Sequence, residues 1–189
     1  AGYLQLLAAR YRDGLAQRAA SLVALASLVA PEPACRAWPQ VLWFDPAVEP
    51  APLDSQPPGM LFRGVGWAAM RSSWEKDAAW ALFVCGDYYA GHQHSDQNSF
   101  VISLKGDLAI DAGEYVAKET SFHNTVLIGD GQRPHGNDPR RFFAPTEEGG
   151  EFDTGDIVAY EENAHFTYVV GDASNAYGAY GVSGDSSGD

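Results

Sequence analysis

Three patterns of hydrophobic and polar residues follow one another along the chain. Between residues 2 and 30, apolar residues recur at helical spacing with one interruption at Gly14, which predicts two helices that end before the PEP sequence. The proline-rich stretch FDPAVEPAPLDSQPPG, from Phe44, favours an extended linker. From Met60 onward, short aromatic and β-branched runs alternate with Gly and Asp, which predicts an antiparallel β-sandwich or barrel.

These patterns divide the chain into residues 1–45 with helices, a linker at 46–58, and β-structure at 59–189. The final GVSGDSSGD favours a polar loop or an artificial end over a last strand, which leaves open that the β domain is cut short there. The chain begins without Met, and its opening lacks the order of a signal peptide, so we expect a segment of a longer protein.

Composition narrows the classes of partner. With 12 Lys and Arg against 25 Asp and Glu, the formal net charge of −13 argues against binding to nucleic acid or to anionic membranes. No apolar run reaches the length of a membrane span. The two cysteines, Cys35 and Cys85, have no CxxC spacing, so two buried free thiols are favoured over a single disulfide.

The stretch GHQHSDQNSF concentrates titratable side chains before an apolar run. If it is extended, His92, His94 and Asp96 share one face, because side chains alternate across a strand. Asp111 ends the run LAID and His123 begins HNTVLIGD, so each lies at a strand edge. Two imidazoles with a carboxylate and a third nitrogen or oxygen nearby are the donors of a metal site.

A simple hairpin does not bring these donors together. A turn at Lys105 and Gly106 pairs Asp111 with Phe100, which leaves His94 six residues, or about 20 Å, further along. Either the segment before Asn98 folds back, or the strand bends, or the site is not there.

Two families resemble this pattern. The spacing from Gly86 through His92 to His94 is similar to the start of the cupin metal motif, but Asn98 or Ser99 replaces its glutamate and its second motif is missing. The wider resemblance is to the C-terminal β-sandwich of the heparinase II/III-like polysaccharide lyases. Its carriers are the ordered segments 92–100 (HQHSDQNSF), 111–113 (DAG) and 123–127 (HNTVL), after GWAAMRSSW.

The resemblance implies a role for each matching residue. His94, Asp111 and His123 match the family's zinc ligands, and we expect that zinc to be a structural clamp. His92 matches the histidine that faces the catalytic cleft, and Tyr115 matches an aromatic residue that lines it. The helices at 1–45 would be the last ones of an (α/α) toroid, and the toroid's catalytic residues are not in this chain, so the fragment should be inactive alone.

The implied reaction is β-elimination on a uronate-containing polysaccharide such as an alginate or a glycosaminoglycan. It requires groups that neutralise a carboxylate, accept a proton and donate one, which suits His and Tyr. The chain itself is acidic, but QRPHGNDPRRFF gathers positive charge. Either this stretch is an ordinary solvated surface, or it lines the cleft, in which case we expect Arg140 and Arg141 to contact the anionic substrate. Such substrates imply a periplasmic or secreted enzyme.

A second class of function stays open from the sequence. The β-sandwich could be a metal-stabilised carbohydrate-binding or structural module, with exposed aromatic residues such as Tyr88, Tyr89, Tyr177 and Tyr180 as a sugar-stacking platform.

Overall fold

The computed structural model describes residues 2–29, 38–87, 93–112, 120–129, 134–135 and 154–178. The chain divides into two compact units, Ala1–Pro57 and Pro58–Asp189. None of the described helices is long and apolar enough to cross a membrane.

The first unit is helical. It contains α1 (Gly2–Tyr11), α2 (Gly14–Val29), α3 (Trp38–Trp43) and a 3-10 turn at Leu53–Ser55. The break between α1 and α2 falls just before Gly14, as predicted, because Asp13 caps α2: its Oδ1 accepts the backbone N–H groups of Leu15 and Ala16 at 2.9 and 3.1 Å.

The proline-rich segment contacts this helical unit. The Ala51 N–H donates to the Gly14 carbonyl at 2.8 Å, and the Arg12 guanidinium lies 3.9 Å from the Asp45 carboxylate. A Cβ on Gly14 would lie 2.6 Å from the Glu49 carbonyl oxygen, so a glycine is needed for this crossing. The segment's role as a linker between domains stays a prediction.

The second unit is mainly β and antiparallel, as the sequence predicts. Five strands form one sheet in chain order: β1 (Gly59–Phe62), β2 (Trp67–Arg71), β3 (Trp80–Val84), β4 (Ser99–Ser103) and β5 (Asp107–Ala109). Two hairpins complete the described strands, β6 (Ile128–Gly129) with β7 (Pro134–His135) and β8 (Asp156–Glu162) with β9 (Thr167–Asp172). Short helical turns lie at Arg63–Val65 and Thr120–Phe122, and α5 is Ser174–Gly178.

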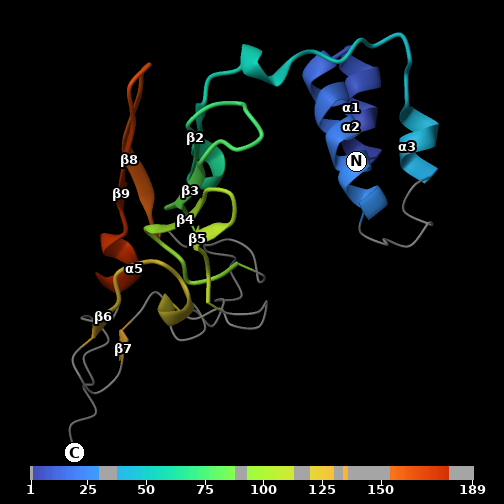
Figure 1. Ribbon diagram of the computed structural model, residues 1–189. Helices are drawn as coiled ribbons and strands as arrows, with labels where there is room; N and C mark the ends of the chain where they lie inside the picture. The colour runs from blue at the N-terminus through green and yellow to red at the C-terminus, as the bar shows by residue number, and fades with distance from the viewer. Residues whose placement is uncertain are drawn as a thin grey trace, which may run out of the picture. The chain divides into compact units, whose positions relative to one another are not determined.

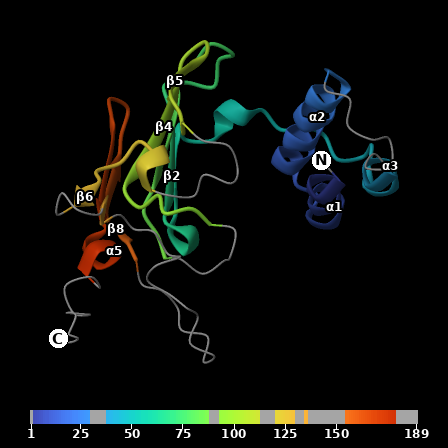
Figure 2. The ribbon, with the colours of Figure 1, turned by 90° about the horizontal axis from the view of Figure 1, so that it is seen from below.

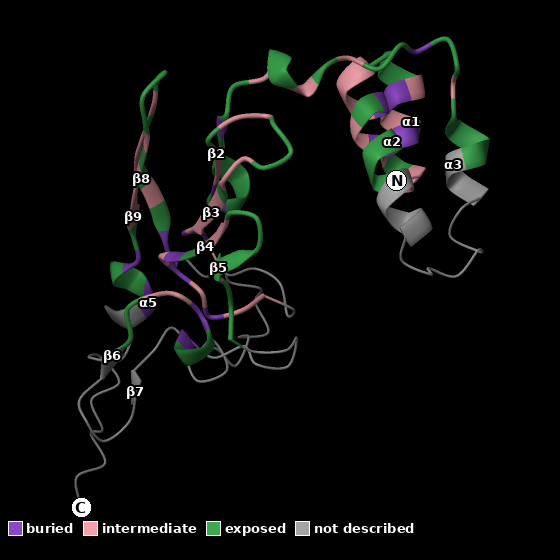
Figure 3. Cartoon of the chain, viewed as in Figure 1, coloured by how far each residue is buried: buried purple, intermediate pink, exposed green. Residues whose placement is uncertain are grey.

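The β8–β9 hairpin lies against the five-stranded sheet, which gives the two layers of a sandwich (Figures 1 and 2). At one end, the Gly59 N–H donates to Glu162 Oε1 at 3.1 Å. At the other end, Cys85, Ala173 and Ala176 form a buried cluster, with Phe83 and Ile157 packed against it. Figure 3 shows buried positions concentrated around the segment that precedes β4, near α5.

The other face of the sheet carries exposed aromatic side chains. The register pairs Phe62 with Trp67 and Trp67 with Val84, so these side chains share one face. Because side chains alternate along β3, Trp80 lies on this same face. Phe62, Trp67 and Trp80 are between 42% and 46% exposed.

Two glycines, Gly66 and Gly86, allow the start of β2 and the end of β3 to approach each other closely. Gly66 has φ +64°, and a Cβ there would collide with the Cys85 carbonyl and with Gly86 Cα. The Cys85 N–H donates to the Gly66 carbonyl at 2.8 Å across this contact. The close approach fixes where the chain leaves β3 toward residues 93–97.

We expect Gly66→Ala to lower the free energy of unfolding by about 2–3 kcal/mol, because a Cβ meets backbone atoms and a positive φ is strained. Gly64→Ala is the matched control: nothing lies within 4 Å of its added Cβ, so the change should stay within about 0.5 kcal/mol. Urea unfolding of both variants measures this. Equal losses in the two would contradict the close approach.

Cys85 is a buried free thiol, and burial raises its pKa to about 11. The reactive thiolate is therefore scarce near neutral pH and increases as the pH approaches 11. With Cys35 replaced by Ser, native protein should react with iodoacetamide at pH 8 at least about 100-fold more slowly than urea-unfolded protein. Equal rates would show that Cys85 is accessible and that the buried cluster is misplaced.

Candidate metal and cleft site

A tight turn brings His94 back toward the sheet. The Ser99 N–H donates to the Asp96 carbonyl at 3.0 Å, and Asn98, inside this turn, has φ 56°. Asn tolerates this left-handed conformation better than most residues do. The segment before Asn98 thus folds back, which places the His94 and His123 rings near each other, and the metal ligands stay a prediction.

Strands β4 and β5 pair in the expected register at one position and shift by a bulge at the next. Ile102 pairs with Ala109, which is the register that a turn at Lys105 and Gly106 predicts. A bulge then shifts the pairing to Ser103 with Asp107. Lys105 has φ 56° and Gly106 has φ 146°, so the turn uses two positive-φ positions. Asp111 follows the end of β5.

The segment around His123 lies beside the start of β4 and the residues after β5. Phe100 and Asn124 exchange two hydrogen bonds: the Phe100 N–H donates to the Asn124 carbonyl at 3.3 Å, and Asn124 Nδ2 donates to the Phe100 carbonyl at 3.0 Å. The Ala112 N–H donates to the Phe122 carbonyl at 2.8 Å. These bonds hold His123 next to Asp111.

His94, Asp111 and His123 therefore come together from three segments. Asp111 Oδ2 lies 3.0 Å from His123 Nδ1, and the ring centroids of His94 and His123 are 5.1 Å apart. The His123 side chain is 1% exposed, yet neither ring nitrogen has a hydrogen-bond partner among the described residues. The short contact with Asp111 thus lacks the alignment of a hydrogen bond.

Two unpartnered nitrogens on a buried imidazole are costly unless something binds them. A metal ion is one such partner, and two imidazoles with a carboxylate are donor types that zinc accepts. As the side chains are placed, no group of three His, Cys, Asp or Glu in the described part of the chain could hold a metal ion. The donor types and the buried His123 fit a metal, and the ligand assignment stays a prediction.

Asp96 lies close enough to Asp111 and His123 for their charges to affect its pKa. Burial raises the pKa of its carboxyl group to about 6; the neighbouring Asp111 adds to the increase and His123 opposes it. Strand alternation in the sequence predicts that Asp96 shares a face with His92 and His94. In the structure the turn, rather than strand alternation, brings it there.

Gln97 holds the loop through a buried hydrogen-bond network that the sequence does not indicate. Its Oε1 accepts the Gly86 N–H at 2.9 Å, and its Nε2 donates to Thr154 Oγ1 at 3.2 Å. Thr154 Oγ1 donates in turn to the Gly86 carbonyl at 3.1 Å, and Thr125 Oγ1 donates to the Gln97 carbonyl at 2.7 Å. No local pattern signals these partners, because Thr154 is 57 residues away from Gln97.

The remaining predicted site residues lie outside the described residues. They are His92, Tyr115, Arg140 and Arg141, and their assigned roles stay predictions. The same holds for Tyr88, Tyr89 and Tyr180, and for the side chain of Tyr177.

The fold and the site define an antiparallel β-sandwich domain with a His-Asp-His cluster at one sheet edge. The family described as Heparinase II/III-like, C-terminal, matches residues 54–182. The chain belongs to this family, which decides against the cupin alternative and associates the chain with polysaccharide lyases. A comparison with curated proteins finds no match.

Proposed function

We propose that the chain is the C-terminal part of a polysaccharide lyase that cleaves a uronate-containing polysaccharide by β-elimination. Two observations support this. The family match covers most of the second unit. The observation that carries the proposal is the convergence of His94, Asp111 and buried His123, whose family motif accompanies a catalytic cleft.

In the proposed reaction, the C–H bond next to the uronate carboxylate breaks and its electron pair forms a C=C bond. The bond to the glycosidic oxygen two carbons away then breaks, and that oxygen takes a proton. The enzyme must therefore neutralise the carboxylate, hold a base and supply an acid. We assign His92 to the cleft as a group that neutralises the carboxylate or accepts the proton. Tyr115 would line the cleft with a hydroxyl group that can exchange a proton with the leaving oxygen, and Arg140 and Arg141 would contact the substrate.

We further propose that His94, Asp111 and His123 hold zinc as a structural clamp. Bound zinc would accept the lone pair of one His123 ring nitrogen and would fix the orientation of its ligands. His92 precedes His94 by two residues, so a fixed His94 limits where His92 can lie. The clamp thus positions a cleft residue without taking part in the reaction.

The remaining parts of the proposal concern the whole protein. The helices of the first unit would end an (α/α) toroid that supplies further catalytic residues, so the chain alone would be inactive. A polymeric substrate of this kind places the enzyme in the periplasm or outside the cell. Sugar binding without cleavage is the competing function, and it would leave the polymer intact.

The full-length protein should release unsaturated uronate, seen as a rise in ultraviolet absorbance, from at least one polymer in a set of alginate, heparan sulfate, hyaluronan and acidic exopolysaccharides. His92→Ala and Tyr115→Phe should each lower kcat by about 100-fold or more, the size expected for loss of a proton-transferring group. Tyr168→Phe is the control: Tyr168 is 52% exposed on β9, and kcat should not change.

Binding of these polymers without any unsaturated product would contradict the lyase proposal and favour the binding module. Full activity in both His92→Ala and Tyr115→Phe would leave the reaction but overturn the assigned residues.

A further inference from the structure

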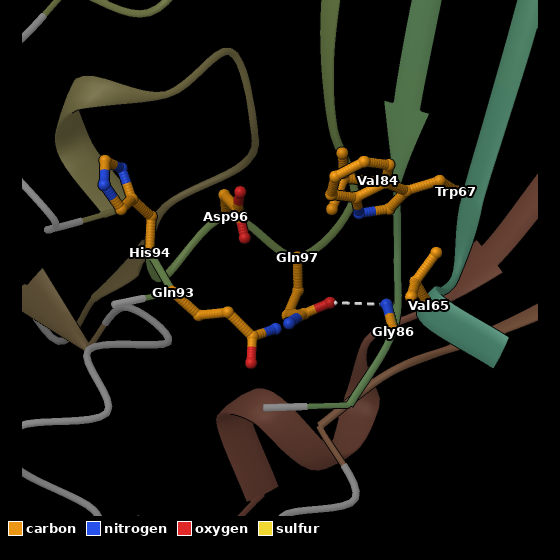
Figure 4. A pocket seen from close by; sticks show the side chains of 8 residues that line it. All are labelled: Val65, Trp67, Val84, Gly86, Gln93, His94, Asp96 and Gln97. Carbon is orange, nitrogen blue, oxygen red and sulfur yellow. Dashed lines mark hydrogen bonds between the residues drawn. The ribbon is translucent and has the colours of Figure 1, made fainter. Parts of the chain in front are cut away.

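Gln97 is the residue at which three parts of the site meet. It follows His94 by three residues, and with His94 and Trp67 it lines a pocket of about 230 Å³ beside the His-Asp-His cluster (Figure 4). Its side chain points toward Gly86, and the dashed line in Figure 4 marks the bond between them. Because Gln97 is buried, water does not compete for its polar groups.

The side chains of Gln97 and Thr154 close a ring of hydrogen bonds on Gly86. The Gly86 N–H donates to Gln97 Oε1, Gln97 Nε2 donates to Thr154 Oγ1, and Thr154 Oγ1 donates to the Gly86 carbonyl. Both backbone polar groups of Gly86 are therefore bound by side chains. The next carbonyl, that of Asp87, accepts a bond from Gln93 Nε2 at 3.0 Å. Two successive residues after β3 are thus tied to the loop before β4.

Thr125 joins this loop to the segment that carries His123. Thr125 Oγ1 donates to the Gln97 carbonyl at 2.7 Å, and the Thr125 N–H donates to the His123 carbonyl at 2.9 Å. Two further bonds join the same segment to β4, beyond the turn. The 5.1 Å separation of the His94 and His123 rings therefore depends on a short series of contacts that passes through Gln97.

Such contacts affect metal binding even though they do not touch the metal. A metal ion is bound most tightly by donors that are already in place. If the loop that carries His94 is in place in only a fraction of the molecules, the apparent dissociation constant for the metal rises by the inverse of that fraction. The ring of bonds on Gly86 and the bond from Thr125 restrict this loop before any metal binds.

We propose that Thr125 and Thr154 are positioning residues that set the zinc affinity of the His-Asp-His cluster, each acting through Gln97. This role rests on the zinc clamp of the proposed function. It adds a dependence on the second layer of the sandwich, because Thr154 lies just before β8 and yet contributes to how tightly the metal is held.

The test is the zinc affinity of the metal-free, full-length protein, measured by competition with a chromophoric chelator. Thr125→Val and Thr154→Val keep the shape of the side chain and remove the hydroxyl group. Each should weaken zinc binding about tenfold or more, the size seen when an outer partner of a metal site is lost. Thr125→Ser and Thr154→Ser keep the hydroxyl group and should bind zinc within about twofold of wild type.

Two control variants separate positioning from a general loss of stability. Thr167→Val makes the same change at the other end of the β8–β9 hairpin, where Thr167 pairs with Glu162, and should leave zinc affinity unchanged. Glu162→Ala removes the bond to the Gly59 N–H, which also joins the two layers but lies six residues, about 20 Å, along β8 from Asp156. It should lower stability toward urea and leave zinc affinity unchanged.

Unchanged zinc affinity in both valine variants, equal losses in the serine and valine variants, or an equal loss in Glu162→Ala would overturn the positioning role. If one valine variant does not fold, the other decides the outcome. Wild-type protein that binds no zinc would contradict the clamp and the positioning role together, whereas zinc held equally by all variants would contradict the positioning role alone. The expected pattern in a protein that releases no unsaturated uronate would contradict only the lyase proposal.

Discussion

The arrangement of the site depends on one buried polar contact, the side chain of Gln97. Its amide joins Gly86, after β3, to Thr154, just before β8. Gln97 is 3% exposed. A buried amide that lost these partners would carry a substantial free-energy penalty, so the loop before β4 has little freedom to take another path. The same contact therefore fixes the turn at Asp96–Ser99 and, through it, the place of His94.

Gly66, directly before β2, and Gly86, after β3, provide the second constraint. Backbone contact between Gly66 and Gly86 leaves no room for side chains between these strand ends, so Trp67 and Val84 lie at the edge of the sheet beside the loop. The cluster and the pocket thus share one set of supports. Gly86 contacts Gln97, in the loop that carries His94, and also Gly66, which precedes Trp67. These two contacts bring His94 and Trp67 near each other.

Local signals in the sequence were sufficient for much of the fold. The helix break before Gly14, the antiparallel strands after Met60 and the pairing of Ile102 with Ala109 follow from spacing and turn residues. The position of His94 required a turn with Asn98 at positive φ, and spacing alone left that as one of three possibilities. The Gln97 network and the pocket were not predictable, because Thr154 and Trp67 are distant in sequence from the loop that they contact.

We propose that the fold gathers His94, Asp111 and His123 into a zinc site. X-ray absorption spectroscopy at the zinc edge of the zinc-loaded protein tests it most directly. The account predicts about one zinc per chain with only nitrogen and oxygen neighbours, at about 2.0–2.2 Å, and outer-shell scattering from two imidazoles. In His123→Ala, one imidazole contribution should disappear. Sulfur neighbours, an unchanged spectrum in that variant, or no bound zinc would contradict the account.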